Sequence, residues 1–248
     1  MRINKFISEA GLCSRREADE WIGAGRVSVN GVTAVLGTRI APGDEVRIDG
    51  ELLRARPERV YLALNKPVGI ECTTNRSVPG NIVDFVGYHE RVFPVGRLDK
   101  DSEGLILLTN DGNIVNTILR SQNEHEKEYV VSVDRPLTRE FLQEMAQGVP
   151  VLDTITKPCR LRQVGRNTFH IVLTQGLNRQ IRRMCEHFGY TVRRLQRIRI
   201  MHIELGTLPM GKWRRLGADE ISALLGGRRT LRLAAGRPPR GPAGRQQP

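Results

Sequence analysis

Three carboxylates stand close together in a polar stretch of the chain. Asp99, Asp101 and Glu103 alternate along residues 96–112, which run from a polar loop into an apolar segment. Carboxylates in such a loop can bind a cation, or one of them can act on a substrate as a nucleophile or a base. The spacing therefore opens two alternatives that involve a metal ion and one that does not.

A calcium-binding loop is the first metal alternative. The three carboxylates and Gly104 occupy the first, third, fifth and sixth positions of that pattern, but Asn110 stands at the twelfth, where calcium loops carry a bidentate Glu. The apolar run after Gly104 predicts a strand, whereas calcium loops of this kind lie between two helices. A calcium site is therefore disfavoured.

A magnesium site of a nuclease is the second metal alternative. An extended chain would place Asp99, Asp101 and Glu103 on one side. Arg97 and Lys100 are interleaved with them, however, and no second acidic cluster stands out in the sequence. The five histidines and four cysteines are scattered without ligand spacing, so we expect no metal site.

The net charge of +12 favours a polyanionic partner. Residues 1–58 carry nine basic and nine acidic residues, residues 59–225 carry 24 and 18, and residues 226–248 carry six arginines and no acid. Seven arginines fall within residues 179–199, against the single acid Glu186. Such a concentrated positive stripe is typical of a surface that binds the phosphates of nucleic acid.

Four motifs follow one another in the second part of the chain. They are Gly-Arg-Leu-Asp with Gly-Leu-Ile-Leu-Leu-Thr (96–109), Lys-Glu-Tyr-Val-Val (127–131), Gly-Leu-Asn-Arg-Gln-Ile-Arg-Arg-Met (176–184) and Leu-Gln-Arg (195–197). Their order resembles that of the pseudouridine synthases, and Ser-Glu-Gly-Leu within the first motif is similar to their RsuA branch. The resemblance is strongest to a subgroup that acts on large-subunit ribosomal RNA. Arg179 stands where another common form of the third motif has His, and that subgroup shares the departure.

The resemblance implies catalytic roles for three residues. Asp99 would be the carboxylate that acts at the sugar, as nucleophile or base, and Tyr129 would stack on the target base. Arg182 would pair with Asp99 and hold it ionised. Arg97 would fill the space that the base leaves when it turns out of its helix or loop. Isomerising uridine to pseudouridine changes no oxidation state and adds no group, so no cofactor is implied. The arginine-rich segment supplies further candidates for RNA contact: Arg179, Arg183 and Arg197.

The first 58 residues predict a small module of their own. Apolar spacing predicts a helix over residues 3–10, and Ser14 with Glu17 predicts a capping box that begins a second helix, residues 15–24. Short strands with tight turns are expected near Val29 and Ile48. This order resembles the alpha-L RNA-binding fold. It implies RNA contact through the basic residues Lys5, Arg15, Arg16 and Arg26.

The middle section, residues 59–225, predicts an α+β catalytic domain with a mostly antiparallel mixed sheet, because strands and helices mix without a regular repeat. A polar linker over 51–59 should join it to the module. We expect strands at 60–64, 105–109, 129–133, 169–173 and 197–205, and helices at 113–120, 138–147, 179–188 and 219–225. Residues 226–248 are rich in Gly, Pro and Arg, which predicts a disordered basic tail.

The function that fits these patterns best is isomerisation of a uridine in structured RNA, with large-subunit ribosomal RNA preferred and a tRNA anticodon arm as a second substrate. Two alternatives use the same surfaces: an RNA-binding or ribosome-assembly protein without catalysis, and a metal-dependent nuclease. The start of the chain has no apolar signal core, no apolar run has membrane-spanning length, and the cysteines are isolated. We therefore expect a soluble cytoplasmic monomer without membrane contact.

Overall fold

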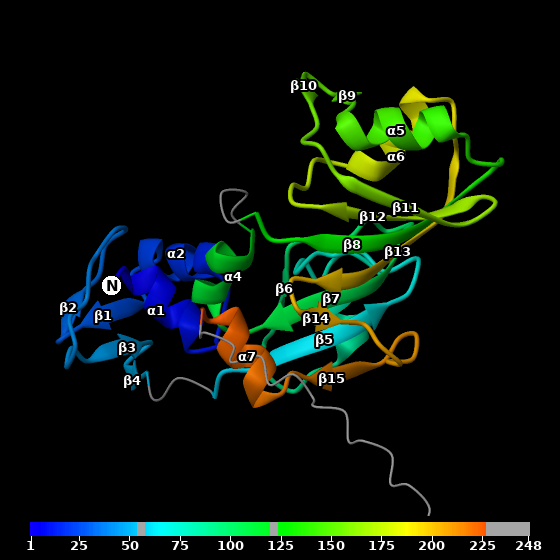
Figure 1. Cartoon of the computed structure of the whole chain (residues 1–248). Helices are drawn as coiled ribbons and strands as arrows, with labels where there is room; N and C mark the ends of the chain where they lie inside the picture. The colour runs from blue at the N-terminus through cyan, green and yellow to red at the C-terminus, as the bar shows by residue number, and fades with distance from the viewer. Residues whose placement is uncertain (54–57, 120–123, 227–248) are drawn as a thin grey trace, which may run out of the picture.

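The computed structural model describes residues 1–53, 58–119 and 124–226, and it places a small N-terminal module beside a larger domain built on one long sheet (Figure 1). Almost all of the expected tail, residues 227–248, lies outside the described residues, as do four residues of the expected linker. No helix among the described residues combines the length and apolar character needed to cross a membrane.

Two helices and four short strands form the N-terminal module. Helix α1 (Ile3–Glu9) and helix α2 (Arg15–Gly23) pack together over an antiparallel sheet of order β2-β1-β3-β4. The strands are β1 (Val27–Val29), β2 (Val32–Thr33), β3 (Val46–Ile48) and β4 (Glu51–Leu52). The expected linker therefore begins as a strand, because residues 51 and 52 pair with β3.

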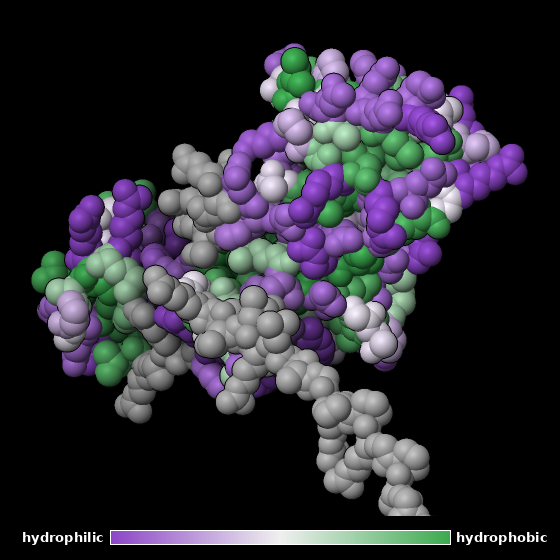
Figure 2. Space-filling view, viewed as in Figure 1, coloured by the Kyte–Doolittle hydropathy of each residue, from purple (hydrophilic) through white to green (hydrophobic). Residues whose placement is uncertain are grey.

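The capping box at the start of α2 is confirmed. The Ser14 hydroxyl accepts a hydrogen bond from the Glu17 amide at 3.1 Å, and the Glu17 carboxylate accepts one from the Ser14 amide at 2.6 Å. The apolar side chains behind it, including Ile3, Ile7 and Ile22, form a separate small core. Hydrophobic side chains also lie on the outer edge of the module (Figure 2), where the exposed residues are Val32, Val35 and Leu36. The expected monomeric state stays a prediction.

The larger domain is organised by a nine-stranded sheet, which confirms the expected α+β fold. Its main path runs β11-β12-β8-β13-β7-β5-β15, with β6 added to β7 and β14 to β13. The strands are β5 (Tyr61–Lys66), β6 (Phe93–Val95), β7 (Glu103–Thr109), β8 (Lys127–Val133), β11 (Arg160–Gly165), β12 (Thr168–Leu173), β13 (Val192–Ile200), β14 (Ile203–Glu204) and β15 (Trp213–Arg215). A separate hairpin joins β9 (Pro150–Val151) to β10 (Thr154–Ile155).

The central strands are buried on both faces, so their side chains alternate between two cores. Along β5 and β7, Ala63 and Leu107 pack toward one side, while Leu64 and Ile106 pack toward the other. The helices complete these cores: α3 (Ile82–Val86), α4 (Gly112–Leu119), α5 (Arg139–Gln147), α6 (Gln180–His187) and α7 (Ala218–Leu224). Figure 1 shows α5 and α6 beside the β8–β12 half of the sheet, and α4 and α7 near the N-terminal module.

Strand β13 corrects one expectation. It runs over Val192–Ile200, whereas the sequence predicted a strand over residues 197–205. Met201 adopts a left-handed conformation with φ of 54°, and the chain turns there into β14, which pairs back antiparallel to β13. The sequence did not predict the charged start of β13. Arg194 there pairs with Glu103 on β7, and a local apolar pattern does not reveal such a contact.

The junction of β7 with β13 is the one parallel pairing in the described part of the large sheet. It contains two residue pairs, Gln196 with Glu103 and Arg197 with Gly104. Gly104 has φ of 102°, and a Cβ atom there would lie 2.8 Å from the backbone nitrogen of Arg197. A side chain at this position would force the two strands apart, so the glycine permits the close approach.

Candidate active site

The loop between β6 and β7 holds Asp99 in a fixed position. Leu98 anchors the loop in the core, and its amide donates a hydrogen bond to the Cys72 thiol at 3.4 Å. The Ser102 amide donates to the Asp99 carbonyl at 3.0 Å, and the Gly69 amide donates to the carbonyl of the residue after Asp99 at 2.8 Å. The Asp99 side chain retains 27% of its accessible surface, so it is held from behind while its carboxylate stays open to the pocket.

Two arginines from the start of α6 face the Asp99 carboxylate. Nη1 of Arg179 lies 3.7 Å and Nε of Arg182 lies 3.8 Å from the same oxygen, Oδ2 of Asp99. The Arg182 side chain is only 14% exposed and is fixed by its Nη2, which donates to the Asp101 carbonyl at 2.8 Å and to the Ser102 hydroxyl at 3.0 Å. Its Nε is buried without a hydrogen-bond partner. The pairing of Arg182 with Asp99 expected from the resemblance is therefore present as a loose ion pair.

Asp101 takes the closer contacts of these arginines. Both of its carboxylate oxygens accept hydrogen bonds from Arg179 at 3.0 Å, and Arg182 Nε lies 3.4 Å from Oδ2 of Asp101. The hydrogen bonds from Arg179, and then the charge of Arg182, lower the pKa of Asp101. The Arg179 side chain nevertheless keeps 42% of its accessible surface and lines the cavity, so its expected contact with RNA stays a prediction.

Tyr129 and Arg197 lie opposite each other on neighbouring strands. They are paired across the β8–β13 ladder, and the Arg197 guanidinium lies 6.0 Å from the centre of the Tyr129 ring. Arg197 is only 4% exposed, and its Nε donates to the Leu105 carbonyl at 2.7 Å. Arg197 lines the cavity, so a group of the RNA could come near it only by entering the cavity, and its expected contact with RNA stays a prediction.

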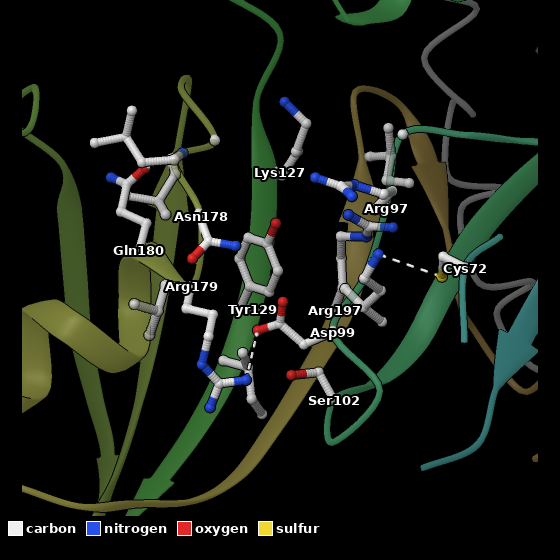
Figure 3. Close-up of a pocket in the computed structure, with 18 of the residues that line it drawn as sticks. Cys72, Arg97, Asp99, Ser102, Lys127, Tyr129, Asn178, Arg179, Gln180 and Arg197 are labelled. Carbon is white, nitrogen blue, oxygen red and sulfur yellow. Dashed lines mark hydrogen bonds and ion pairs between the residues drawn. The ribbon is translucent and has the colours of Figure 1, made fainter. Parts of the chain in front are cut away.

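Asp99, Tyr129, Arg179 and Arg197 line one cavity of about 840 Å³. Figure 3 shows Tyr129 in its middle, with Asp99 below the ring, Asn178 and Arg179 on one side, and Arg97 and Arg197 on the other. Arg97 is exposed at the rim. The cavity can hold a flat aromatic ring on Tyr129 with its attached sugar toward Asp99.

The turn before α6 directs two neighbouring side chains to different parts of the site. Arg179 has a left-handed backbone, with φ of 51° and ψ of 33°, and it directly precedes the helix. Its side chain reaches Asp101, while that of Asn178 lies beside Tyr129 (Figure 3). Gln180 is buried and accepts a hydrogen bond from the Leu177 amide at 3.0 Å, which closes the turn.

The carboxylates do not converge as a metal site would need. Glu103 turns away from Asp99 and pairs with Arg194 at 2.6 Å, and Asp101 is engaged by Arg179 and Arg182. Among the described residues, no three His, Cys, Asp or Glu side chains are grouped in a metal-binding arrangement. Asp99 and Asp101 share two arginines, so their charges are directed at guanidinium groups, which suits nucleophilic or base chemistry better than the calcium or magnesium alternatives.

The RNA-contact candidates of the N-terminal module differ in their surroundings. Arg15 and Arg16 are exposed at the start of α2. Lys5 donates a hydrogen bond to Asn113 at 2.6 Å, across to the larger domain, and Arg26 forms a two-pronged ion pair with Asp49. The charges of Arg15 and Arg16 are thus the more available. Arg183, in the second domain, is half-buried and donates to the Asn178 carbonyl at 3.2 Å.

Sequence reasoning missed several residues of the site. Asp101 was considered only as a metal ligand, and Asn178 and Cys72 carried no signal of their own. Lys127 could have been found, because it lies two residues before Tyr129 on a strand, and residues at that spacing share one face. It lines the cavity together with Tyr129.

Comparison with known proteins adds independent information. Residues 60–187 match the family described as RNA pseudouridylate synthase, and residues 1–46 match the S4 domain. The chain is 55% identical over 223 residues to the dual-specificity RNA pseudouridine synthase RluF of Escherichia coli strain K12, with 89% of this chain and 77% of that protein covered. It is 35% identical over 232 residues to the ribosomal large subunit pseudouridine synthase B of Bacillus subtilis, with 90% and 95% covered. A crystal structure of a pseudouridylate synthase superposes with a TM-score of 0.67 at 31% identity, with 90% of this chain and 99% of that chain covered.

Proposed function

Because the chain belongs to the RNA pseudouridylate synthase family, we propose that it isomerises a uridine of large-subunit ribosomal RNA to pseudouridine, with Asp99 as the catalytic carboxylate. The chain is an RNA isomerase with an S4 RNA-binding domain at its start. The observation that carries the role of Asp99 is its position in a cavity beside Tyr129 with two guanidinium groups within 4 Å.

The reaction needs few groups. The bond between C1′ of the sugar and N1 of the uracil breaks, the ring turns, and a bond forms between C1′ and C5. The C5 proton leaves, and N1 gains a proton, so atoms and electrons balance without an oxidant or a cofactor. Asp99 can assist at the sugar, either by bonding to a carbon or by taking a proton from it.

The neighbours of Asp99 suit this task. Arg182 and Arg179 place positive charge beside the carboxylate, yet both lie more than 3.5 Å from it, so its oxygen is not held in short hydrogen bonds. Tyr129 gives the detached uracil a flat surface on which to turn. Arg97 at the rim is placed to fill the gap in the RNA after the uridine has left its stack.

The RNA has to reach the cavity and the N-terminal module together. Arg91 donates a hydrogen bond to the Cys13 carbonyl at 2.8 Å, and this contact holds the module against the larger domain. Arg15 and Arg16 on α2 would then contact RNA phosphates outside the cavity. Ribosomal RNA is the preferred substrate, in keeping with the name of the relative from Bacillus subtilis. A tRNA anticodon arm is the second substrate. An enzyme that modifies these RNAs would act in the cytoplasm.

The test is to incubate the purified chain, in a chelator, with ribosomal RNA and tRNA from a strain that lacks this modification, and to map pseudouridine chemically. We expect a new pseudouridine in large-subunit RNA. Asp99→Asn should slow its formation by about a hundredfold to ten-thousandfold, because the carboxylate acts on the reacting sugar. Asp153→Asn, which changes an exposed carboxylate outside the cavity, is the matched control.

Three results would contradict the proposal. RNA binding without any product would favour an assembly protein, and strand cleavage that depends on added metal would favour a nuclease. Unchanged pseudouridine formation by Asp99→Asn would leave the reaction in place but remove Asp99 from it.

A further inference from the structure

The cationic side chains around the cavity fall into two groups. Arg179 is neutralised by Asp101. The other cations that line the cavity form no ion pair within 4.0 Å with any carboxylate that the structure describes: Arg97, Lys100, Lys127 and Arg197. Arg97 and Lys100 are exposed to solvent, whereas Lys127 is half-buried and Arg197 is buried. An unpaired charge in a partly closed site is costly. Unpaired cations there therefore favour the binding of an anion from outside the chain.

Lys127 is poorly satisfied by the protein itself. It lies on β8 two residues before Tyr129, on the same face, and it lines the cavity. Its ammonium donates to the His125 carbonyl at the long distance of 3.4 Å. Burial lowers the pKa of Lys127, and the nearby charge of Arg197 lowers it further. An anion bound at this ammonium would relieve both effects.

Arg197 adds to the positive potential at Lys127. It is nine-tenths buried, and its Nη2 is enclosed without any hydrogen-bond partner. Its charge also acts on Lys66, whose pKa is lowered first by burial, and on Cys72. Because Arg197 is almost inaccessible, it can act on a ligand mainly through its field, whereas Lys127 can touch one.

We propose that Lys127, supported by Arg197, is a binding subsite for a backbone phosphate of the RNA next to the uridine held on Tyr129. The inference rests on the proposed function. Two residues along a strand span roughly 7 Å, which brings Lys127 within reach of the backbone beside a nucleoside stacked on Tyr129. A lysine ammonium is a compact point charge that suits a phosphate. Figure 3 shows Lys127 beyond the end of the Tyr129 ring opposite to Asp99, which leaves the catalytic oxygen clear.

The experiment uses the full chain and a short ribosomal RNA hairpin in which the wild type forms pseudouridine. Hairpins with a single neutral methylphosphonate linkage, on the 5′ or the 3′ side of the target uridine, are compared with the native hairpin. Affinity and single-turnover rate are measured for the wild type and Lys127→Gln. Lys157→Gln is the matched control, because Lys157 is exposed, lies outside the cavity and is already paired with Glu124.

We expect Lys127→Gln to weaken binding by about tenfold to a hundredfold, since it removes one charged hydrogen bond. The slope of log affinity against log salt should fall by about 0.7, the value for one phosphate contact on single-stranded RNA. One of the two neutral linkages should weaken the wild type by a similar factor and leave Lys127→Gln unaffected. Lys127→Arg keeps the cation and should restore most of the affinity, which separates loss of charge from loss of fold.

The proposal is wrong if both neutral linkages weaken Lys127→Gln as much as they weaken the wild type, or if Lys127→Arg binds as poorly as Lys127→Gln. A uracil oxygen as the true partner would give the first of these results. Failure of the proposed function is distinguishable, because the wild type would then form no pseudouridine in any ribosomal RNA.

Discussion

Replacing Gly104 with alanine should destabilise the junction of β7 and β13 on which the cavity depends. The added Cβ would overlap the Arg197 carbonyl oxygen, and it would lie 2.8 Å from the Arg197 nitrogen and 3.0 Å from its carbonyl carbon. All three atoms belong to the backbone of a strand held on both sides, so none can move as the end of a flexible side chain would. The backbone of Gly104 also has φ of 102°, which alanine rarely adopts.

The size of the effect follows from these two strains. Holding a residue other than glycine at such a φ costs about 1–3 kcal/mol. Forcing extra volume into packed structure costs about 1–3 kcal/mol more. The lower entropy of the unfolded alanine chain offsets about 0.4–1 kcal/mol of this. We therefore expect Gly104→Ala to lower the free energy of unfolding by about 1–5.5 kcal/mol.

Urea unfolding followed by tryptophan fluorescence measures this quantity. Trp213 lies on β15 of the large sheet and Trp21 lies in the N-terminal module, so a Trp21→Phe background leaves only the larger domain to report. Gly112→Ala is the matched control, since its Cβ would meet only a side-chain atom of Arg15 at 3.9 Å and its φ is ordinary. It should change stability by less than about 1 kcal/mol.

The midpoint of Gly104→Ala should fall while the m value stays near that of the wild type, because the same surface is exposed on unfolding. Activity should fall as well at temperatures where the variant is folded, since a displaced β13 carries Arg197 away from Tyr129. The same unfolding midpoint for Gly104→Ala and Gly112→Ala would refute the rigid close approach.

Three further predictions follow from other parts of the structure. Asp101→Asn should free both neighbouring arginines to approach Asp99 more closely, which should lower kcat by about tenfold to a hundredfold because the Asp99 oxygen would then be held in short contacts; an unchanged kcat would contradict this positioning role. Arg15→Gln combined with Arg16→Gln should weaken RNA binding and reduce the salt slope by about 1.5 while leaving single-turnover chemistry at saturation intact; an unaltered slope would exclude them as phosphate contacts. The hydrogen bonds from Arg214 lower the folded-state pKa of Glu220 below its ordinary value of 4.5, so its contribution to stability is complete above about pH 5 and is lost as the pH falls through the folded-state value. Glu220→Gln should therefore lose less stability than the wild type between pH 7 and pH 3 in urea melts, and equal losses would argue against this ion pair.

The sequence predicted local structure well where neighbouring residues determine it. The capping box of Ser14 and Glu17 depends on residues three apart, and the structure confirms it. The buried runs around residues 60–64 and 105–109 predicted strands for the same reason, and β5 and β7 cover them except for residue 60. The order of the four motifs predicted the family, and the family comparison confirms it.

The sequence did not predict short strands whose formation depends on a pairing partner and not on local strand propensity. Strand β15 holds only three residues, Trp213–Arg215, and two of them are arginines. It exists because β5 offers an edge that it can pair with. Such an edge is created by residues far away in the chain, so no window of local sequence contains the information.

The four motifs indicated the reaction class, and they made Asp99, Tyr129 and Arg182 the candidates for catalysis, because those residues lie in contiguous motifs. The distribution of charge in the site, by contrast, emerges only from the folded chain. Arg179 and Arg197 have the same chemistry in the sequence, yet one is engaged by a carboxylate from a loop 78 residues away and the other is buried beside Tyr129 without a carboxylate. Pairing energy depends on separations of a few ångströms and on exclusion of water, and both arise only when distant strands come together.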